Sequence, residues 1–287
     1  MERLADRVAW ITGGASGIGL AIAHRLADEK VKLVLVDIEQ AALDAAEAAL
    51  KAKGASVLAI RADVASSAEV AAAAARAKET FGLVHIIVNN AGVGGNGGPM
   101  WSIAEGDWQW ALGVNLWGVI HGIRHLLPAL IESGEEGHVV NTASMAGLTS
   151  TPFMAPYTAT KHAVVAMSEC LAKELELAKS KVKVSVLCPG FVQTNINTSD
   201  RNRSKDYGSK TQSAGADKFR DVLATLVSSG KPAATVGEQV VSAIKTDKFY
   251  ILTHPEMKPA IEHRMKQILE EQPPGIDPMM RALFGSQ

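Results

Sequence analysis

The stretch that decides the fold is Val8-Ala9-Trp10-Ile11-Thr12-Gly13-Gly14-Ala15-Ser16-Gly17-Ile18-Gly19, near the start of the 287-residue chain. An apolar run typical of a buried strand ends in a cluster of glycines, and a helical pattern begins directly after them. A strand, a tight glycine turn and a helix N-terminus in this order can hold a pyrophosphate, whose charge the helix terminus favours. The glycines at 13, 17 and 19 do not have the G-x-G-x-x-G spacing, and such turns also occur without ligands. The turn by itself leaves both readings open.

Downstream of this turn, short β-branched runs alternate with Ala-rich helical stretches. This pattern is typical of βαβ units that build a parallel sheet, so we expect one α/β domain over 1–287 with a seven-stranded, Rossmann-type doubly wound sheet. Strands are expected near 7–12, 32–37, 56–61, 84–89, 137–143, 182–188 and 249–253, and helices near 18–29, 40–53, 66–80, 107–133, 156–179, 235–245 and 257–271. A polar stretch over 193–218 breaks the pattern. We therefore expect a substrate-binding lid over 191–235, followed by a C-terminal strand, helix and tail over 246–287.

Composition narrows the class of protein. The formal net charge of −1 provides no basic field that would hold nucleic acid. No apolar run approaches the ~20 residues that a membrane span needs, and no charged-then-apolar leader precedes the first strand. We expect a cytoplasmic protein with neither a nucleic-acid nor a membrane partner. Its two cysteines, Cys170 and Cys188, lie in predicted secondary structure and are interpreted as reduced core thiols.

The second predicted strand ends in Asp37, where a carboxylate would meet the 2′-hydroxyl of a ribose. The same carboxylate would repel a 2′-phosphate, and neither Ile38 nor the Ala15-Ser16 turn offers a cation that would bind one. The pattern therefore favours NAD over NADP. The alternative is a solvated aspartate at the end of a strand.

Further motifs resemble the short-chain dehydrogenase/reductase family over residues 5–195. The glycine turn fits its T-G-x-x-x-G-x-G pattern, Asn89-Asn90-Ala91-Gly92 resembles its N-N-A-G, and Asn115, Ser144, Tyr157 and Lys161 have the order and spacing of its catalytic tetrad. The resemblance implies cofactor contacts at Gly13, Ser16, Gly17, Ile18, Gly19, Asp37, Ile38, Asp63, Val64, Asn90, Ala91, Gly92, Tyr157, Lys161, Pro189, Gly190, Val192 and Thr194. The ending over 248–256 lacks the usual Gly-rich final strand and resembles members that oxidise bulky aryl alcohols, including Cα-dehydrogenases.

The predicted chemistry centres on Tyr157 and Lys161, which share one helix face because they are four residues apart. A free tyrosine has a pKa near 10, so we expect positive charge from Lys161 and an oxidised nicotinamide to stabilise the tyrosinate. Tyr157 then acts as general acid and base. Ser144 follows a predicted strand and is placed to hydrogen-bond the substrate oxygen. Each residue also has a plain structural reading, a solvated Tyr-Lys pair and a turn serine, and only their conjunction with the glycine turn and Asp37 favours catalysis.

Asn115 interrupts an apolar helical run and predicts a local kink there. In the family such an asparagine helps to hold a water that links the lysine to solvent. Without the resemblance, Asn115 reads as a satisfied core amide.

Apolar residues flank the predicted site in sequence and indicate an apolar substrate pocket. The predicted substrate contacts are Ser144, Met145, Phe153, Met154, Tyr157 and Phe191, with Trp101 at the rim. His121 and His125 have the spacing of helical zinc ligands, but a third ligand is not identifiable, so we assign no metal and read the pair as packing or interface residues. The helices over 107–133 and 156–179 are apolar around much of their circumference, which predicts a homo-oligomer. The resemblance suggests a tetramer or a dimer.

Together these features predict an NAD(H)-dependent oxidoreductase that interconverts a secondary alcohol and its ketone, with a bulky apolar or aromatic substrate. Two alternatives keep the same fold: an NAD-binding sensor or scaffold without activity, and a lyase or epimerase. The first would not need the tetrad, and a cofactor-free lyase would not need Asp37 or the glycine turn. The sequence has no G-x-S-x-G elbow and no Gly-Lys-Ser/Thr loop, which argues against a hydrolase or a phosphate-hydrolysing enzyme.

Overall fold

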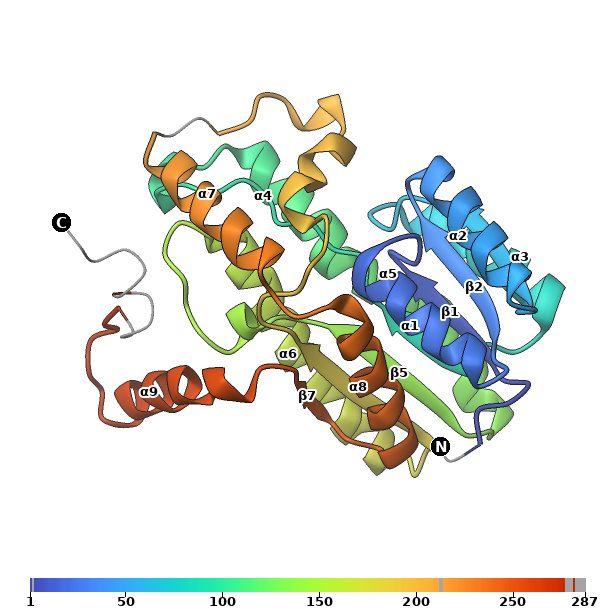
Figure 1. Cartoon of the computed structure of the whole chain (residues 1–287). Helices are drawn as coiled ribbons and strands as arrows, with labels where there is room; N and C mark the ends of the chain where they lie inside the picture. The colour runs from blue at the N-terminus through green and yellow to red at the C-terminus, as the bar shows by residue number, and fades with distance from the viewer. Residues whose placement is uncertain (2, 212–213, 277–280, 282–287) are drawn as a thin grey trace.

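Parallel strands form a single sheet at the centre of the computed structural model, which describes residues 1, 3–211, 214–276 and 281 (Figure 1). Within those residues the sheet has seven strands in the order β3-β2-β1-β4-β5-β6-β7, which confirms the predicted fold. The strands are β1 (Val8–Thr12), β2 (Lys32–Asp37), β3 (Val57–Arg61), β4 (Ile86–Asn89), β5 (Gly137–Thr142), β6 (Val182–Cys188) and β7 (Tyr250–Leu252). The order reverses between β1 and β4, so their carboxyl ends open the crevice where this kind of sheet binds ligands.

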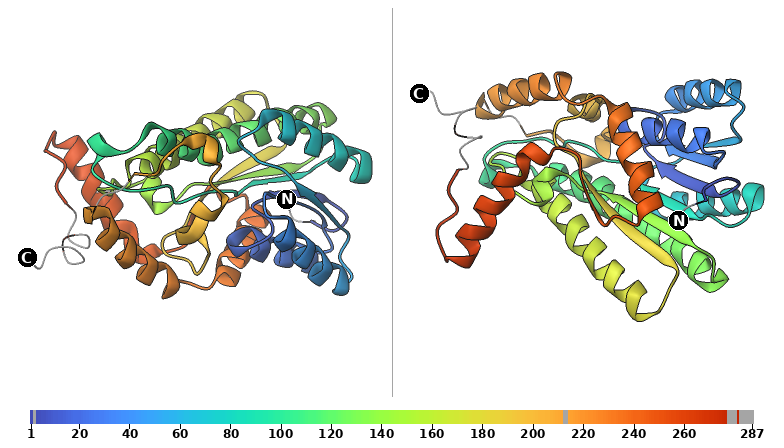
Figure 2. Two further views of the ribbon diagram at one scale, coloured as in Figure 1. Left: turned by 90° about the horizontal axis from the view of Figure 1, so that it is seen from above. Right: turned by 60° about the horizontal axis from the view of Figure 1, so that its bottom comes forward.

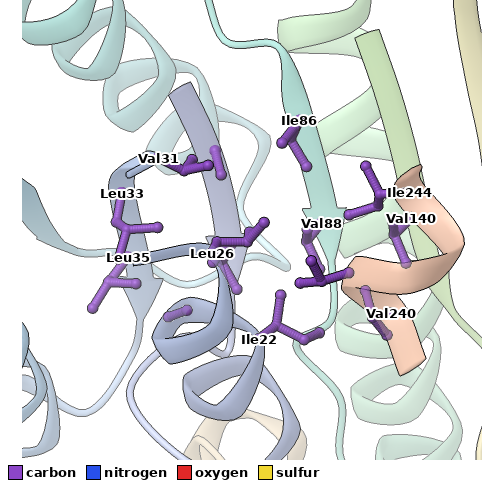
Figure 3. Packing of buried hydrophobic residues seen from close by; sticks show 14 of the residues in the cluster. Ile22, Leu26, Val31, Leu33, Leu35, Ile86, Val88, Val140, Val240 and Ile244 are labelled. Carbon is purple, nitrogen blue, oxygen red and sulfur yellow. The ribbon is translucent and has the colours of Figure 1, made fainter. Parts of the chain in front are cut away.

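Helices cover both faces of the sheet, as Figure 2 shows. The α-helices are α1 (Gly17–Asp28), α2 (Gln40–Ala52), α3 (Ser67–Phe81), α4 (Glu105–Leu112), α5 (Gly118–Ser133), α6 (Ala155–Leu177), α7 (Ala214–Ser228), α8 (Ala233–Thr246) and α9 (Lys258–Leu269). One core lies between the sheet and helices α1, α2 and α8 (Figure 3). A second core packs α3, α5 and the end of α6 against the opposite face. Because both faces are covered, strands β1 and β2 are apolar runs with polar residues only at their ends.

The helix expected over 107–133 is divided into three parts. Between α4 and α5 lies the π-helical turn η2 (Gly113–Trp117), with the buried Asn115 at its centre. The local irregularity predicted at Asn115 is thus a π-helical turn, which widens the helix and does not break it. The stretch over 191–235 is more ordered than a polar loop: it contains the 3₁₀ turns η4 (Ile196–Asn202) and η5 (Lys205–Tyr207) and the helix α7.

The prediction that both cysteines are core thiols was half wrong. Cys188 is buried in β6, but Cys170 lies on the exposed side of α6, because a 23-residue helix on the outside of a sheet keeps one face in solvent. In the part of the chain that the structure describes, no helix combines the length and the hydropathy needed to cross a bilayer.

Candidate active site

The glycine turn between β1 and α1 has the geometry that a bound pyrophosphate needs. Gly13 and Gly17 have φ of 63° and 52°, a region that favours glycine. A Cβ on Gly19 would lie 2.1 Å from the Gly13 carbonyl oxygen, so only glycine lets the helix begin this close to the turn. Helix α1 starts at Gly17 with Ser16 as its N-cap, and the Ser16 side chain makes no capping hydrogen bond. The first backbone N–H groups of the helix therefore face the crevice at the carboxyl end of β1.

Asp37 closes the same crevice from the end of β2. Its carboxylate accepts hydrogen bonds from the N–H of Ala15 at 3.1 Å and from the N–H of Glu39 at 3.2 Å, which ties the carboxylate to the glycine turn. Burial raises the pKa of Asp37 above its ordinary value, and the backbone N–H donors offset part of that effect. The carboxylate thus lies where the sequence predicted it.

A cation also lies near Asp37, contrary to the sequence reasoning. Arg201 from η4 lines the crevice and forms an ion pair with Glu39 over 2.5 Å, and Asn202 donates to the same carboxylate at 2.9 Å. The residues next to Asp37 in sequence could not predict this cation, because Arg201 is more than 160 residues further along the chain. Glu39 neutralises the charge of Arg201.

The N-N-A-G motif is fixed to the first strand. The Thr12 hydroxyl oxygen accepts hydrogen bonds from the N–H groups of Asn90 and Ala91, at 2.9 and 3.0 Å. The Asn90 amide donates to the Thr12 carbonyl at 3.0 Å. These bonds hold the carboxyl ends of β1 and β4 together on the floor of the crevice, so the threonine of the glycine motif has a role that glycine spacing alone does not indicate.

Tyr157, Lys161 and Ser144 meet at the other end of the crevice. Tyr157 and Lys161 lie one turn apart at the start of α6, and the Lys161 ammonium is 5.6 Å from the centre of the tyrosine ring. That ammonium is buried and donates to the Thr142 carbonyl over 2.9 Å. Ser144 follows β5 and forms a hydrogen bond with Tyr157. The predicted catalytic side chains are therefore brought together.

Burial dominates the electrostatics of this group. Burial raises the pKa of Tyr157, and only its hydrogen bond with Ser144 acts in the opposite direction. Burial also lowers the pKa of Lys161 to about 8, which the nearby Cys188 thiol partly opposes. The Lys161 ammonium keeps its charge while it bonds the neutral Thr142 carbonyl, but burial still dominates the pKa of Tyr157.

Asn115 is buried and uses its side chain on the loop that follows β4. Its Oδ1 accepts from the Val93 N–H at 2.8 Å, and its Nδ2 donates to the Val93 carbonyl at 3.0 Å. This pairing positions Gly92, where a Cβ would lie 3.4 Å from Asn115 Oδ1 and 3.5 Å from Lys161 Nζ. Asn115 thus shapes the wall beside the lysine.

Most predicted cofactor residues line one crevice. These are Gly13, Ser16, Gly17, Ile18, Asp37, Ile38, Asp63, Val64, Asn90, Ala91, Gly92, Tyr157, Lys161, Pro189 and Thr194. Gly19, Gly190 and Val192 do not line it; Gly19 follows Ile18 and Gly190 follows Pro189, both of which do, whereas the neighbours of Val192 do not. Sequence reasoning missed the lining residues Glu39, Ala62, Val93, Trp110, Val114, Thr142, Ala143, Asn195, Ile196, Ser199, Arg201, Asn202, Ser204 and Tyr207. Only Thr142 and Ala143, at the end of a predicted strand, carried a positional signal.

The predicted substrate residues do not form one wall of this crevice. Met145 is 3% exposed and packs into the core with Val164 and Cys188, because the turn after β5 directs it inward. Phe153, with φ of 65°, is 39% exposed, and its carbonyl accepts from the Gly98 N–H. Met154 and Phe191 are half-buried, and Trp101 is 90% exposed.

The two spaced histidines bond within the chain. The His121 ring donates to the Val64 carbonyl over 2.9 Å, and His125 lies 3.0 Å from the Ser67 hydroxyl. In the described residues, groups of three or more potential metal ligands are not found.

Comparisons with known proteins place this site in a family. Residues 7–205 match the family model for short chain dehydrogenases. The chain is similar to a solved short chain dehydrogenase/reductase from Burkholderia phymatum in complex with NAD, with 40% identity, a TM-score of 0.94 and coverage of 96% of this chain and 99% of the other. It is 36% identical to a CLA biosynthesis dehydrogenase/reductase of Lactiplantibacillus plantarum (96% of this chain, 98% of the relative) and 30% identical to a C alpha-dehydrogenase of Sphingobium sp. strain SYK-6 (96% and 89%). The chain belongs to the short-chain dehydrogenase/reductase family.

Proposed function

We propose that this oxidoreductase uses NAD(H) to interconvert a secondary alcohol and its ketone, with Tyr157 as general acid and base. The observation that carries the proposal is one continuous crevice with Asp37 and the glycine turn at one end and Tyr157 and Lys161 at the other. A relative of known structure, 40% identical, is a complex with NAD. An NAD-binding sensor would need the first end of the crevice but not the second.

The residues at the first end fit a dinucleotide. A Cβ on Gly13 would lie 3.0 Å from Ala91 Cα, one on Gly17 would lie 3.1 Å from the Thr194 side chain, and one on Gly19 would lie 2.1 Å from the Gly13 carbonyl oxygen. Larger side chains would therefore not fit this turn beside the crevice. Asp37 keeps a carboxylate at the crevice wall, where it accepts a ribose hydroxyl and repels a 2′-phosphate. When bound, NAD supplies the hydride chemistry and, in its oxidised form, a positive charge near the tyrosine.

At the second end the chain supplies the proton chemistry. Tyr157 accepts the hydroxyl proton during alcohol oxidation and donates one during ketone reduction. Ser144 donates a hydrogen bond to the oxygen on which charge develops. Lys161 holds a positive charge behind the phenol, and its pKa of about 8 keeps most of that charge at neutral pH. The raised pKa of Tyr157 implies that proton abstraction needs further positive charge beside the ring.

We infer a bulky apolar or aromatic substrate from the surfaces beside this group. Phe153 and Trp101 expose large apolar side chains on the segments that follow β5 and β4, and the half-buried Phe191 follows the Pro189 turn. Relatives named C alpha-dehydrogenase and levodione reductase act in the same family. The segment over 191–235 would serve as the lid for this substrate.

We also expect a homo-oligomer, a tetramer or a dimer. Trp117, Ile131 and Leu177 are 47, 40 and 84% exposed, on or beside helices α5 and α6. We take these exposed apolar side chains as candidates for contacts with a second copy of the chain.

The test is a panel of secondary alcohols and ketones with NAD(H) and NADP(H), followed by the absorbance of the reduced nicotinamide. Tyr157→Phe should lower kcat by at least ~10²-fold, the scale of general acid–base catalysis, and leave NADH affinity nearly unchanged. Tyr250→Phe is the matched control, because Tyr250 lies on β7 and donates to Glu169 at 2.6 Å. Tight NADH binding without turnover of any compound would support the sensor instead.

A further inference from the structure

One buried histidine holds the segment between the proposed catalytic group and the lid. His254 follows β7, is 7% exposed and contacts the turn that follows β6. Its Nδ1 lies 3.1 Å from the backbone nitrogen of Gly190, and its Nε2 lies 3.0 Å from the carbonyl oxygen of Phe191. The ring therefore bridges two residues of one turn.

These two partners fix the protonation state of the ring. A backbone N–H only donates, so Nδ1 facing Gly190 must be an acceptor. A carbonyl oxygen only accepts, so Nε2 facing Phe191 must carry the hydrogen. The Thr253 hydroxyl, 2.7 Å from Nδ1, is satisfied as a donor to the same nitrogen. The neutral Nε2–H tautomer is the one form that satisfies both backbone partners.

The turn that His254 holds is joined directly to Ser144. The Pro189 carbonyl accepts hydrogen bonds from the Met145 N–H at 2.9 Å and from the Ser144 hydroxyl at 3.4 Å. On the other side, a Cβ on Gly190 would lie 2.9 Å from the His254 Nδ1. A shift of the imidazole is therefore passed to the backbone that positions the serine.

We propose that His254 is a positioning residue that, as the neutral Nε2–H tautomer, clamps the turn over Pro189–Phe191 against Ser144 and sets the pocket at that end of the crevice. The assignment rests on the proposed function, because it takes Ser144 as the group that contacts the substrate oxygen. His254 belongs to the chain's ending over 248–256.

Protonation would break this clamp. A second hydrogen on Nδ1 would meet the Gly190 N–H head to head, so the turn would have to move. The charged groups that act on the ring are Lys231, from the segment between α7 and α8, and Glu256, from the turn η6 (Pro255–Met257). Burial and then Lys231 lower the pKa of His254, which Glu256 partly offsets. The clamp is thus intact at neutral pH and is lost as the pH falls through a value below 6.5.

The first arm of the test does not depend on catalysis. In the full chain with ¹⁵N-labelled histidine, two-bond ¹H–¹⁵N spectra at pH 7.5 should show His254 as the Nε2–H tautomer. His254→Asn identifies its signals by their loss. An Nδ1–H tautomer or a charged ring at pH 7.5 would overturn the proposal, whatever the enzyme turns over.

The second arm measures the kcat of ketone reduction against pH for His254→Phe, His254→Asn and the control His263→Asn on helix α9. In this direction Tyr157 acts in its protonated form and causes no acid limb of its own. Asparagine keeps an oxygen where Nδ1 accepts from Gly190, whereas phenylalanine keeps only the ring. We expect kcat at pH 7.5 to fall about ten- to a hundredfold in His254→Phe and less in His254→Asn. The acid limb of the profile should disappear in both variants and persist in the control.

A His254→Phe variant that folds, as thermal unfolding would show, and keeps kcat within twofold with an unchanged acid limb would contradict the proposal. If His254→Phe does not fold, the acid limb of His254→Asn decides. If the unsubstituted chain turns over no alcohol at all, the proposed function fails separately, and the tautomer still decides the clamp.

Discussion

Replacing Asp107 with asparagine tests what holds the proposed lid in place. Asp107 lies in α4 and is fully buried, and its carboxylate accepts from the Thr211 N–H at 2.8 Å, the Thr211 hydroxyl at 2.7 Å and the Asn96 amide at 2.8 Å. The Arg203 guanidinium lies 3.2 Å away, with its side chain 3% exposed. Burial raises the pKa of Asp107, but these hydrogen bonds and Arg203 outweigh it and leave the pKa below its ordinary value. Residues 203–211 are thus docked on α4 through one buried carboxylate.

The expected loss follows from leaving Arg203 without a counter-ion. Asparagine keeps the shape and one acceptor oxygen of Asp107 but removes its charge. Breaking a buried ion pair by removing one partner costs about 3–5 kcal/mol. The lid segment can escape this cost by detaching, so the loss appears as local opening and not as global unfolding. A cost of about 3 kcal/mol corresponds to roughly a hundredfold faster amide exchange over 203–211.

Hydrogen–deuterium exchange of peptides over 203–211 measures this opening. Arg203→Met combined with Asp107→Asn removes both charges, so the double variant should recover part of the protection. Asp206→Asn is the control, because Asp206 is an exposed carboxylate of the same segment. A less than threefold change in Asp107→Asn, or no recovery in the double variant, would refute the reasoning.

Three further substitutions test other parts of the structure. His138 in β5 is fully buried, and burial lowers its pKa to about 4. Its contribution to the free energy of unfolding is therefore fully present above pH 6.5, and about 3 kcal/mol is lost as the pH drops toward 4. Urea unfolding should show this fall, and His138→Gln should abolish it. Glu39→Gln frees the charge of Arg201, so binding titrations should show NADPH affinity rising severalfold relative to NADH, and adding Arg201→Ala should reverse the gain. Gly106→Ala places a Cβ 1.8 Å from the Tyr207 carbonyl oxygen, so it should speed amide exchange over 203–211 as Asp107→Asn does; unchanged exchange would argue against docking on α4.

The sheet and the first half of the site could be predicted because their signals are local. A strand, glycines and a helix start follow one another within residues 8–19, and Asp37 ends the next strand. Parallel strands bring their carboxyl ends to one edge, so residues found after separate strands converge there. Tyr157 and Lys161 needed only the helical repeat to share a face. The widening of the helix at Asn115 also had a local sequence signal, because Asn115 is a polar residue in an apolar run.

The ion pairs of the proposed lid could not be predicted from any local sequence pattern. Arg201 and Arg203 lie in a polar stretch without periodicity, where the sequence does not say which cation turns inward. Their partners Glu39 and Asp107 precede them by 162 and 96 residues. Burial is also invisible to pattern reasoning, which considered the charges beside Tyr157 but not the burial that raises its pKa.

The two ion pairs of this segment differ in strength because they differ in burial. Glu39 and Arg201 are both about a third exposed, so water screens them and their separation costs little, whereas the Asp107–Arg203 pair is almost fully enclosed. The two arginines are separated by a single residue, Asn202. Opening at the Asp37 end of the crevice therefore requires the exposed pair and the Asn202–Glu39 hydrogen bond to part, while the chain from Arg203 onward stays docked on α4. The backbone around Asn202 then acts as the hinge, and exchange of a ligand at that end need not disturb the pocket beside Tyr157.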